Sequence, residues 1–283
     1  MIDGALPYLR CPVCEQSLSR AERTLRCPAG HAFDLARQGY ANLAAGRVPY
    51  PGDTAEMIAD RDAFLAAGHY DFIADALTGY PGGGLVVDAG TGTGHYLARV
   101  LAADPAALGL GIDVSKAALR RAARAHPRAA AVLADLWRPL PVRDGTAAVI
   151  LDVFAPRNGP EFHRVLRPDG VLLVVTPAPD HLTELIEAYG LIRVDPDKAA
   201  RVAESLDAYF TAVRSRQLRR ELALTAAEVR TLVGMTPSAH HVPAAGLPAG
   251  PRTVTAAVTI TAYRKRGEVQ TERSTSSQSA GLS

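Results

Sequence analysis

Residues 85–94, Leu-Val-Val-Asp-Ala-Gly-Thr-Gly-Thr-Gly, decide the fold of this chain. An apolar run followed by glycines at alternate positions predicts a buried strand, a tight turn and then a helix. The spacing does not suit a dinucleotide site, because the third glycine of G-x-G-x-x-G would fall on His95 counted from Gly90, or on Leu97 counted from Gly92. We therefore expect a ligand without a pyrophosphate, and an adenosyl sulfonium with an amino-acid tail fits that requirement.

Carboxylates recur where each predicted strand of this region ends. Asp88 ends the first strand, Asp113 the second and Asp135 the third. An acid at the tip of the second strand can accept both ribose hydroxyls of an adenosyl ligand. Asp135 would lie near the adenine amino group, although it could also be a loop acid that caps a turn. The pattern predicts that S-adenosyl-L-methionine contacts Asp88, Gly90, Gly92, Gly94, Asp113 and Asp135.

Two further strands are predicted after these, over residues 147–151 and 171–175. Strand and helix patterns alternate throughout this part of the chain. Such alternation predicts an α/β fold with a doubly wound, mostly parallel, Rossmann-like sheet, in which ligands bind at the carboxyl ends of the strands.

All three cysteines lie within the first 27 residues, in the order Cys11-Pro-Val-Cys14, twelve further residues, and Cys27-Pro-Ala-Gly-His31. Each pair of ligands lies on one tight turn, and the four together can close a tetrahedron around one Zn²⁺. Four protein ligands leave no position for water, so this zinc would be structural. An odd number of cysteines argues against a disulfide framework. The alternative is chance clustering beside a surface histidine.

The composition is that of an ordinary globular protein, with 48% apolar and 21% charged residues among 283. No apolar run approaches the roughly 18 residues of a membrane span, and the start does not resemble a secretory signal, so we expect a cytoplasmic protein. The net charge of +2 does not by itself indicate nucleic-acid binding. Arginine outnumbers lysine by 28 to three, which reflects either a GC-rich genome or selection for guanidinium groups that bind phosphates.

Breaks in the periodicity divide the chain into three parts. We expect a zinc-binding domain over residues 1–45, an α/β domain over residues 53–266 and a disordered, Ser/Thr/Gln-rich tail over residues 267–283. Asp53-Thr-Ala-Glu56 resembles a capping box at the start of a helix that ends near Gly68. Residues 190–220 form an insertion that could cover the cofactor.

These features resemble the large-subunit rRNA guanine-N1 methyltransferases, which modify a hairpin loop in domain II of 23S rRNA. The resemblance covers residues 5–266, and within the family it is greatest to the branch that confers tylosin resistance. No single motif would decide it, but their order along the chain is hard to obtain by chance. Besides the zinc ligands, the motifs are His31-Ala-Phe-Asp34, Gly39-Tyr-Ala-Asn-Leu43, Pro51-Gly-Asp-Thr-Ala-Glu-Met57, Phe64-Leu-Ala-Ala-Gly-His-Tyr70, Asp113-Val-Ser-Lys116, Ala155-Pro156, Thr176-Pro-Ala-Pro-Asp-His-Leu182 and Met235-Thr-Pro237.

The resemblance implies an enzyme that transfers a methyl group from S-adenosyl-L-methionine to N1 of a guanine in that hairpin, guanine 748 in this branch, and so lowers macrolide binding. It implies that Tyr70, Gly92, Thr93 and His181 contact the cofactor, that the first domain recognises RNA and that the second is the methyltransferase. The family also suggests a homodimer that forms an RNA cleft. From the residues alone, Tyr70 could be a buried aromatic and His181 an exposed residue at a helix start.

Guanine N1 carries a proton, so a group must accept that proton before or during methyl transfer. Asp152, at the end of the fourth predicted strand, is the candidate catalytic residue by position, although it could be a turn acid. The Gram-negative branch of the family has an arginine there, so the resemblance transfers no role to this position. Phe154 could stack on a flipped-out guanine or fill the core.

Two groups of cations could contact RNA phosphates and so set affinity and salt dependence without choosing the base. The first could equally be the solvated face of a helix. The groups are Arg214, Arg216, Arg219 and Arg220, and the run Arg264-Lys265-Arg266.

Two other functions fit parts of this pattern. A small-molecule methyltransferase, such as a macrolide-tailoring enzyme, would share the cofactor motif, but a small substrate needs no separate zinc module. A non-catalytic zinc RNA-binding protein would share the metal site, but the intact turn over residues 90–94 and Asp113 disfavour it.

Overall fold

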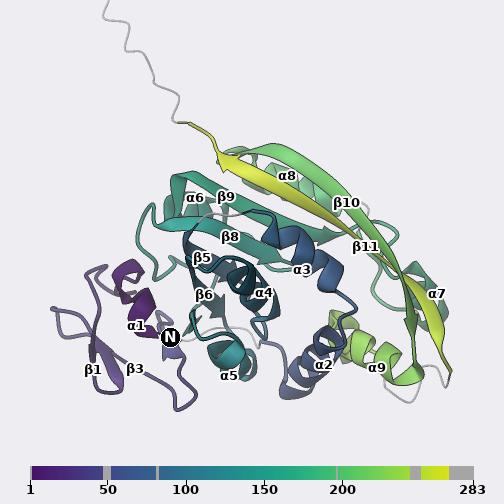
Figure 1. Cartoon of the computed structure of the whole chain (residues 1–283), viewed down its shortest axis with the longest axis horizontal. Helices are drawn as coiled ribbons and strands as arrows, with labels where there is room; N and C mark the ends of the chain where they lie inside the picture. Colours follow the sequence, from purple (N-terminus) through teal and green to yellow (C-terminus); the bar gives the residue numbers. More distant parts are fainter. Residues whose placement is uncertain (1, 47–51, 81–82, 196, 243–249, 268–283) are drawn as a thin grey trace, which may run out of the picture.

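The computed structural model describes residues 2–46, 52–80, 83–195, 197–242 and 250–267 (Figure 1). Its helices are α1 (Ile2–Ala5), α2 (Ala55–Ala66), α3 (Asp71–Thr78), α4 (His95–Ala103), α5 (Lys116–Ala125), α6 (Gly159–Val165), α7 (Thr183–Tyr189), α8 (Lys198–Asp207) and α9 (Ala226–Gly234), with 3-10 turns η1 (Leu6–Tyr8) and η2 (Pro237–His240). Its strands are β1 (Ser19–Ala21), β2 (Thr24–Arg26), β3 (Ala32–Asp34), β4 (Ala41–Asn42), β5 (Gly84–Ala89), β6 (Ala107–Asp113), β7 (Ala129–Leu133), β8 (Ala147–Val153), β9 (Leu166–Pro177), β10 (Phe210–Leu224) and β11 (Arg252–Lys265).

An eight-stranded sheet in the order β10-β11-β9-β8-β5-β6-β7-β4 forms the body of the molecule. The strands from β9 to β4 are parallel, whereas β10 and β11 add an antiparallel edge. The chain runs from β5 to β6 and β7 on one side, and returns to β8 and β9 on the other. The order therefore reverses between β5 and β8, the place where ligands bind in such sheets. The predicted doubly wound, mostly parallel sheet is confirmed.

Both faces of the sheet are buried, which is why β5 reads as a continuous apolar run. Val87 faces a core that includes Phe162 of α6 and Leu206 of α8. Val86 faces a second core that includes Leu97 of α4 and Leu232 of α9. The two layers hold the carboxyl ends of the strands in fixed register, so polar groups placed there keep their positions.

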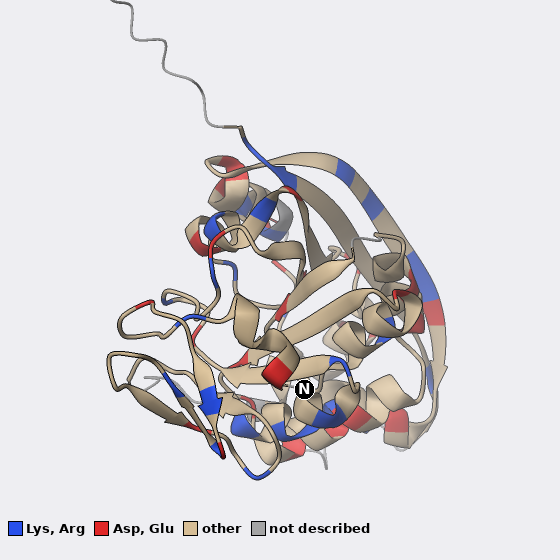
Figure 2. Ribbon diagram, turned by 60° about the vertical axis from the view of Figure 1, so that its left-hand side comes forward, with Lys and Arg blue, Asp and Glu red and all other residues tan. Residues whose placement is uncertain are grey.

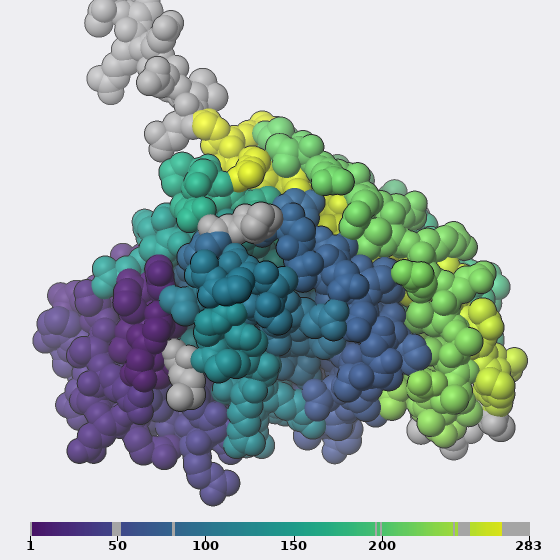
Figure 3. Space-filling view, viewed as in Figure 1, coloured from purple at the N-terminus to yellow at the C-terminus, as the bar shows by residue number. Residues whose placement is uncertain are grey.

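The N-terminal module is continuous with this body. Its strands β1, β2 and β3 form a small antiparallel sheet, but β4 pairs in parallel with β7, Ala41 opposite Val132. Leu25 of the module also belongs to the same core as Val87. Figure 3 shows the purple N-terminal atoms forming one surface with the teal atoms of the sheet domain. The predicted boundary at residues 45–53 stays a prediction, and the predicted disordered tail lies almost entirely outside the described residues.

Three local predictions differ from the structure. Thr54, and not Asp53, is the N-cap of α2, because its hydroxyl accepts a hydrogen bond from the Met57 N–H. The third strand ends at Leu133, two residues before Asp135. Residues 210–220 of the insertion predicted over residues 190–220 belong to the sheet, since they lie in β10, which pairs with β11. Within the described ranges, no helix has the length and apolarity that crossing a membrane requires.

Candidate functional site

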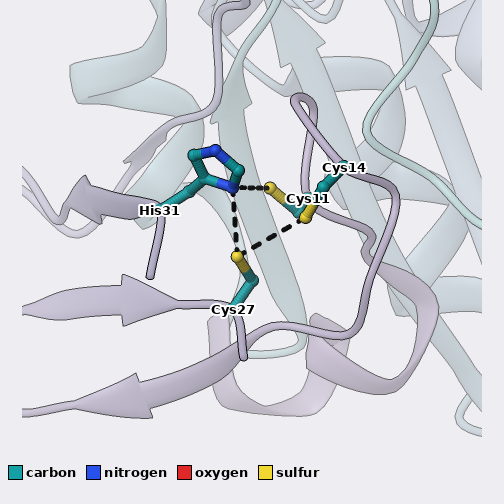
Figure 4. A group of neighbouring side chains, drawn as sticks. All are labelled: Cys11, Cys14, Cys27 and His31. Atoms are coloured by element: carbon teal, nitrogen blue, oxygen red, sulfur yellow. Dashed lines mark hydrogen bonds between the residues drawn. The ribbon is translucent and has the colours of Figure 1, made fainter. Parts of the chain in front are cut away.

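The four predicted zinc ligands come together in the N-terminal module (Figure 4). Cys11 and Cys14 lie on the loop before β1, and Cys27 and His31 lie on the turn between β2 and β3. Their ligand atoms all lie within 4.8 Å of one another. Backbone hydrogen bonds close both turns, from the Glu15 N–H to the Cys11 carbonyl and from the Gly30 N–H to the Cys27 carbonyl.

The distances within this cluster suit zinc. Sγ of Cys14 and Sγ of Cys27 are 3.6 Å apart, and His31 Nδ1 lies 3.7 Å from Cys11 Sγ and 3.3 Å from Cys27 Sγ. A tetrahedron with metal–sulfur bonds of about 2.3 Å and metal–nitrogen bonds of about 2.0 Å separates its ligands by about 3.5–3.8 Å. Burial raises the pKa of Cys27, but hydrogen bonds from Cys14 and His31 outweigh it and lower that pKa to about 6. The donor set and its geometry fit one closed Cys3His zinc site.

The predicted glycine turn follows β5 and lies between two neighbouring elements. Gly90 has φ +77°, and a Cβ there would meet Ala155 at 2.5 Å. Gly94 has φ +81°, and a Cβ there would meet Ala125 at 2.9 Å. Both positions therefore require glycine for conformation and for space. The turn is tight because α5 and the loop after β8 close on it.

Asp113 lies at the end of β6 and caps the same turn. Its carboxylate accepts hydrogen bonds from the Gly92 N–H at 2.8 Å and from the Ser115 N–H at 2.8 Å. Burial raises the pKa of Asp113, and these two bonds lower it in part. A ribose diol could still use the remaining lone pairs of the two oxygens.

Asp88 lies at the end of β5, as predicted, whereas Asp135 lies two residues beyond the end of β7. Asp88 is buried and accepts a hydrogen bond from Thr91 Oγ1 at 2.7 Å. Burial raises its pKa to about 7, with the Thr91 bond opposing the shift. Asp135 accepts a hydrogen bond from the Trp137 N–H at 2.9 Å, so it does cap a turn. A contact between Asp135 and adenine stays a prediction.

Tyr70 and His181 meet although they are 111 positions apart in the chain. Tyr70 Oη lies 3.5 Å from His181 Nε2, and the Ala257 N–H donates to His181 Nδ1 at 3.2 Å. That bond places the proton of a neutral imidazole on Nε2. Burial lowers the pKa of His181 to about 4, so the ring is neutral at physiological pH. Tyr70 is almost fully buried and contacts the Phe64 and Phe72 rings edge-on.

Thr93 is buried at the start of α4, beside a cavity of about 410 Å³. The cavity lies between α2, α4 and α5, so Thr93 faces the helical layer as well as the turn. Its lining is strongly basic, with Arg99, Arg120, Arg121 and Arg124.

Phe154 follows β8 and projects from the carboxyl edge of the sheet. Its side chain is 42% exposed, and its φ is +55°, a left-handed conformation that costs an L-residue roughly 1–2 kcal/mol. Its ring centroid lies 6.2 Å from that of His181, tilted by 33°. An exposed, strained aromatic at the ligand edge of the sheet points to a functional role, because strain of this kind collects at binding sites.

Asp152 lies beneath this loop and is 0% exposed. Arg157 Nη1 is 3.5 Å from its Oδ1, and the Ala155 backbone N–H also lies near the carboxylate, but no described residue donates to either oxygen with good hydrogen-bond geometry. Burial raises the pKa of Asp152 well above its ordinary value, and Arg157 opposes the shift in part. Burial therefore disfavours the ionised carboxylate, which is the form that a general base needs when it acts.

The two predicted cationic groups lie at the antiparallel edge of the sheet. The first is on strand β10, and its interpretation as a helix face was wrong; Figure 2 shows the blue bands along this outermost strand. Arg219 pairs with Asp180, and the Arg220 guanidinium lies 6.0 Å from the centre of the Phe72 ring. The second group is largely engaged within the chain: Arg264 donates to the Asp169 and Gly170 carbonyls, Lys265 to the Leu166 carbonyl, and Arg266 pairs with Asp207.

The sequence reading missed Arg61, which belongs to α2 and lies over the glycine turn. A Cβ on Gly92 would meet Arg61 Nη1 at 3.3 Å. The residue falls inside a helix that the sequence does predict, but nothing in its spacing from residues 85–94 reveals the contact.

Two family models match the chain. A zinc-ribbon model described as "RlmA, N-terminal" matches residues 9–44, and a model described as "Methyltransferase domain" matches residues 86–170. These ranges contain the metal ligands and the glycine turn respectively. They confirm the predicted zinc ribbon and the S-adenosyl-L-methionine-dependent methyltransferase fold.

Similar proteins extend the match along nearly the whole chain. A Micromonospora griseorubida protein, provisionally named 23S rRNA (guanine-N(1)-)-methyltransferase, is 57% identical over 92% of this chain and 98% of its own. The Streptomyces fradiae 23S rRNA (guanine(748)-N(1))-methyltransferase is 50% identical over 85% of this chain and 89% of its own. A chain of the Haloferax volcanii complex between the Trm112 methyltransferase activator and a methyltransferase is 18% identical, with a TM-score of 0.50 over 77% of this chain and 100% of its own, and shows the fold alone. On the identity and coverage of the first two, this chain belongs to the 23S rRNA (guanine-N1)-methyltransferase family.

Proposed function

We propose that this protein transfers a methyl group from S-adenosyl-L-methionine to N1 of guanine 748, in a domain II hairpin loop of 23S rRNA, and thereby confers resistance to tylosin-type macrolides. The observation that carries the proposal is the 50% identity, over 89% of its length, to the Streptomyces fradiae enzyme named for that guanine. The resistance follows from the resemblance to the tylosin-resistance branch.

The cofactor site that we propose lies at the carboxyl edge of β5 and β6. S-adenosyl-L-methionine supplies an electrophilic methyl group when it is bound. In this proposal the Asp113 carboxylate at the end of β6 holds the ribose of the adenosine, and the glycine turn holds the amino-acid tail. Together they aim the methyl group at the acceptor. The residues proposed to contact the cofactor are Tyr70, Asp88, Gly90, Gly92, Thr93, Gly94, Asp113, Asp135 and His181.

The acceptor guanine would stack on Phe154. Its aromatic ring is exposed next to His181 on the same edge of the sheet. Single-stranded loop bases can leave the RNA and stack on an aromatic side chain, which holds the base plane while hydrogen bonds select its edge. Neutral His181 adds no positive charge beside the cofactor's sulfonium.

Asp152 stays our proposal for the group that accepts the N1 proton. Its position, two residues before Phe154, supports the proposal, as do two carboxylate oxygens that no described residue satisfies with a hydrogen bond. Because the side chain is fully buried, the loop that carries Phe154 must shift, and Arg157 must draw closer, before the ionised form can meet the base. Positioned general bases add about 10²–10⁴-fold to a rate.

The zinc module would orient the RNA, which fits a closed metal site with no position left for chemistry. We propose the domain limits predicted from the sequence, residues 1–45 for RNA recognition and 53–266 for methyl transfer. A homodimer and a cytoplasmic location also stay proposals: the first follows from the family resemblance, and the second from where ribosomal RNA is found.

A methylation assay tests the proposal. The full-length protein is incubated with tritiated S-adenosyl-L-methionine and either unmodified 23S rRNA, the same RNA with guanine 748 replaced by adenine, or a free macrolide. Label at N1 of guanine 748, lost in the replaced RNA, is the expected result. Label on the macrolide alone would show a tailoring enzyme, and no label on any substrate would show a binding protein without this activity.

A further inference from the structure

Arg61 is the cation nearest to the glycine turn among the contacts that the structure describes. Its Nη1 lies 3.3 Å, and its Cδ 3.6 Å, from where a Cβ on Gly92 would be. The guanidinium therefore lies directly over Gly92, whose N–H donates to Asp113. A positive charge here lies beside the same backbone that closes the proposed ribose site.

Arg61 has two partners in this structure. Nη1 lies 2.6 Å from Asp53 Oδ2, and Nη2 donates to the Met235 carbonyl at 3.1 Å. Both charged side chains are about one-third exposed. Ion pairs with this much exposure contribute only about 0–1 kcal/mol, so another carboxylate can displace Asp53 at little cost.

The turn offers an anion more than this one cation. Gly94 is the N-cap of α4, and within the described residues no side-chain oxygen caps that helix. Its first N–H groups and the positive end of its dipole therefore favour a negative group nearby. Arg99 and Arg121 are paired in the same way, with Asp71 and Asp75 and with Asp62, but Arg61 is the arginine that lies against Gly92 of the turn.

We propose that Arg61 binds the α-carboxylate of the cofactor's amino-acid tail, and that this carboxylate replaces Asp53 as the partner of its Nη1. S-adenosyl-L-methionine carries a single carboxylate, at the end farthest from its adenine. With the ribose at Asp113, the tail extends along the turn and reaches the side that Arg61 covers. The bond from Arg61 to the Met235 carbonyl is retained, so the bound tail is held against both α2 and the end of α9. The inference rests on the cofactor site proposed above.

Calorimetry with two ligands tests it. S-adenosylhomocysteine carries the carboxylate, and S-adenosyl-3-thiopropylamine is the same molecule without it. We expect the unaltered protein to bind the first about 10- to 100-fold more tightly, the range for a hydrogen-bonded charge pair. Arg61→Gln should lose most of that preference by weakening only the carboxylate-bearing ligand. Arg121→Gln, a matched arginine-to-glutamine change on α5, where Arg121 pairs with Asp62, should keep it.

Asp53→Asn provides a second test that leaves Arg61 in place. Removing the competing anion should tighten S-adenosylhomocysteine severalfold and leave the decarboxylated ligand unchanged. If Arg61→Gln preferred S-adenosylhomocysteine over the decarboxylated ligand as strongly as the unaltered protein does, the inference would be overturned. It would also be overturned if Asp53→Asn weakened both ligands equally. In either case the proposed cofactor site would stand. If the unaltered protein bound neither ligand, the cofactor site and the inference would fall together.

Discussion

The zinc cluster and the proposed cofactor site at the carboxyl edge of β5 and β6 (the cofactor edge) both gather polar groups, but they draw on the chain in opposite ways. The metal ligands all come from residues 11–31, on two turns of one small sheet. The cofactor edge joins Asp88 and Asp113 from strand ends with Tyr70 and His181, which are 111 positions apart. A local site of this kind is held together by its metal, whereas a distributed site is held by the sheet beneath it. Damage to the first should therefore appear as lost stability, whereas damage to the second should appear as lost binding, with stability effects only where a buried group changes its charge.

The two regions are not independent, however. Cys11 and Leu25 of the zinc module share one core with Val87 and Leu110 of the main sheet, and β4 pairs with β7. Loss of the metal should therefore spread from the module into the sheet domain.

The largest expected effect is that of Cys11→Ser. Zinc-finger peptides gain about 10–16 kcal/mol from their metal, so the loss of one ligand should cost this chain about 5 kcal/mol and lower its Tm by about 10–20 °C. Atomic absorption and calorimetry would measure zinc content and melting. The control is Val13→Ser, which changes an exposed side chain on the same turn. Unchanged zinc content and melting in Cys11→Ser would contradict the structural role of the metal.

At the cofactor edge, two buried groups should make stability depend on pH with opposite signs. Burial lowers the pKa of His181 to about 4, so its contribution is present above its ordinary pKa of about 6.5 and is lost as pH falls toward 4. Burial raises the pKa of Asp88 to about 7, so its contribution to the free energy of unfolding is fully present below about pH 3.8 and is lost as the pH rises through 7. Between pH 4 and 7 the two trends offset each other.

Single variants should separate these trends. Relative to Asp88→Asn, the unaltered protein should lose up to about 4 kcal/mol of unfolding free energy between pH 4 and 7, at about 1.4 kcal/mol per pKa unit. Relative to His181→Gln, it should gain up to about 3 kcal/mol between pH 4 and 6.5. Urea denaturation at a series of pH values would measure both differences. Parallel curves for all three proteins would show that neither group titrates in this way.

A smaller effect, on ligand affinity and not on the stability of the fold, is expected from replacing Asp113. Asp113→Ala should weaken S-adenosylhomocysteine about 10- to 100-fold, which corresponds to about 1.5–3 kcal/mol for hydrogen bonds to a charged group. The Gly92 and Ser115 N–H groups also lose their acceptor, so Asp113→Asn is the matched variant that keeps an oxygen and removes the charge. Titration calorimetry would measure both variants. A dissociation constant that neither change alters would remove Asp113 from the ribose role.

The contrast between a local site and a distributed site also explains which features could be predicted from the sequence. The zinc ligands were predicted because the chemistry depends on spacing within one short segment, and the structure brings all four together. The glycine turn and the acids at strand ends were predicted because βα units repeat the same backbone geometry wherever they occur. In the first case the determinants lie in one short segment, and in the second they recur at the same place in successive βα units, so their positions in the sequence reveal them.

What was missed depends on contacts between distant segments. For the arginines of β10, a helix face was one of two readings left open, because that strand is exposed on both faces and lacks apolar alternation. Its partner β11 is what makes it a strand. The burial of Asp152 and the position of Arg61 over Gly92 likewise arise from packing between elements. A period of two in Arg214 and Arg216 was the one local signal of the strand.

The smallest expected effect is a difference in stability between two variants of Phe154, which separates the backbone strain at this residue from the role of its ring. Phe154→Ala and Phe154→Gly both remove the aromatic ring, whose stacking on a base contributes about 1–3 kcal/mol. Both variants should therefore methylate the rRNA hairpin more slowly and bind S-adenosylhomocysteine as before. They differ in the backbone, because alanine keeps the cost of φ +55° and glycine does not.

Phe154→Gly should consequently unfold about 1 kcal/mol less readily than Phe154→Ala, while the two are equally poor enzymes. Denaturant melts and initial rates on the same preparations would measure the two properties. If Phe154→Gly retained the rate of the unaltered protein, the ring would have no part in holding the guanine. If alanine were the more stable of the two, the left-handed backbone would not be strained. A retained rate in Phe154→Gly would mean that another residue must hold the acceptor guanine. A more stable Phe154→Ala would leave the stacking role in place and would remove only backbone strain as a property of that turn.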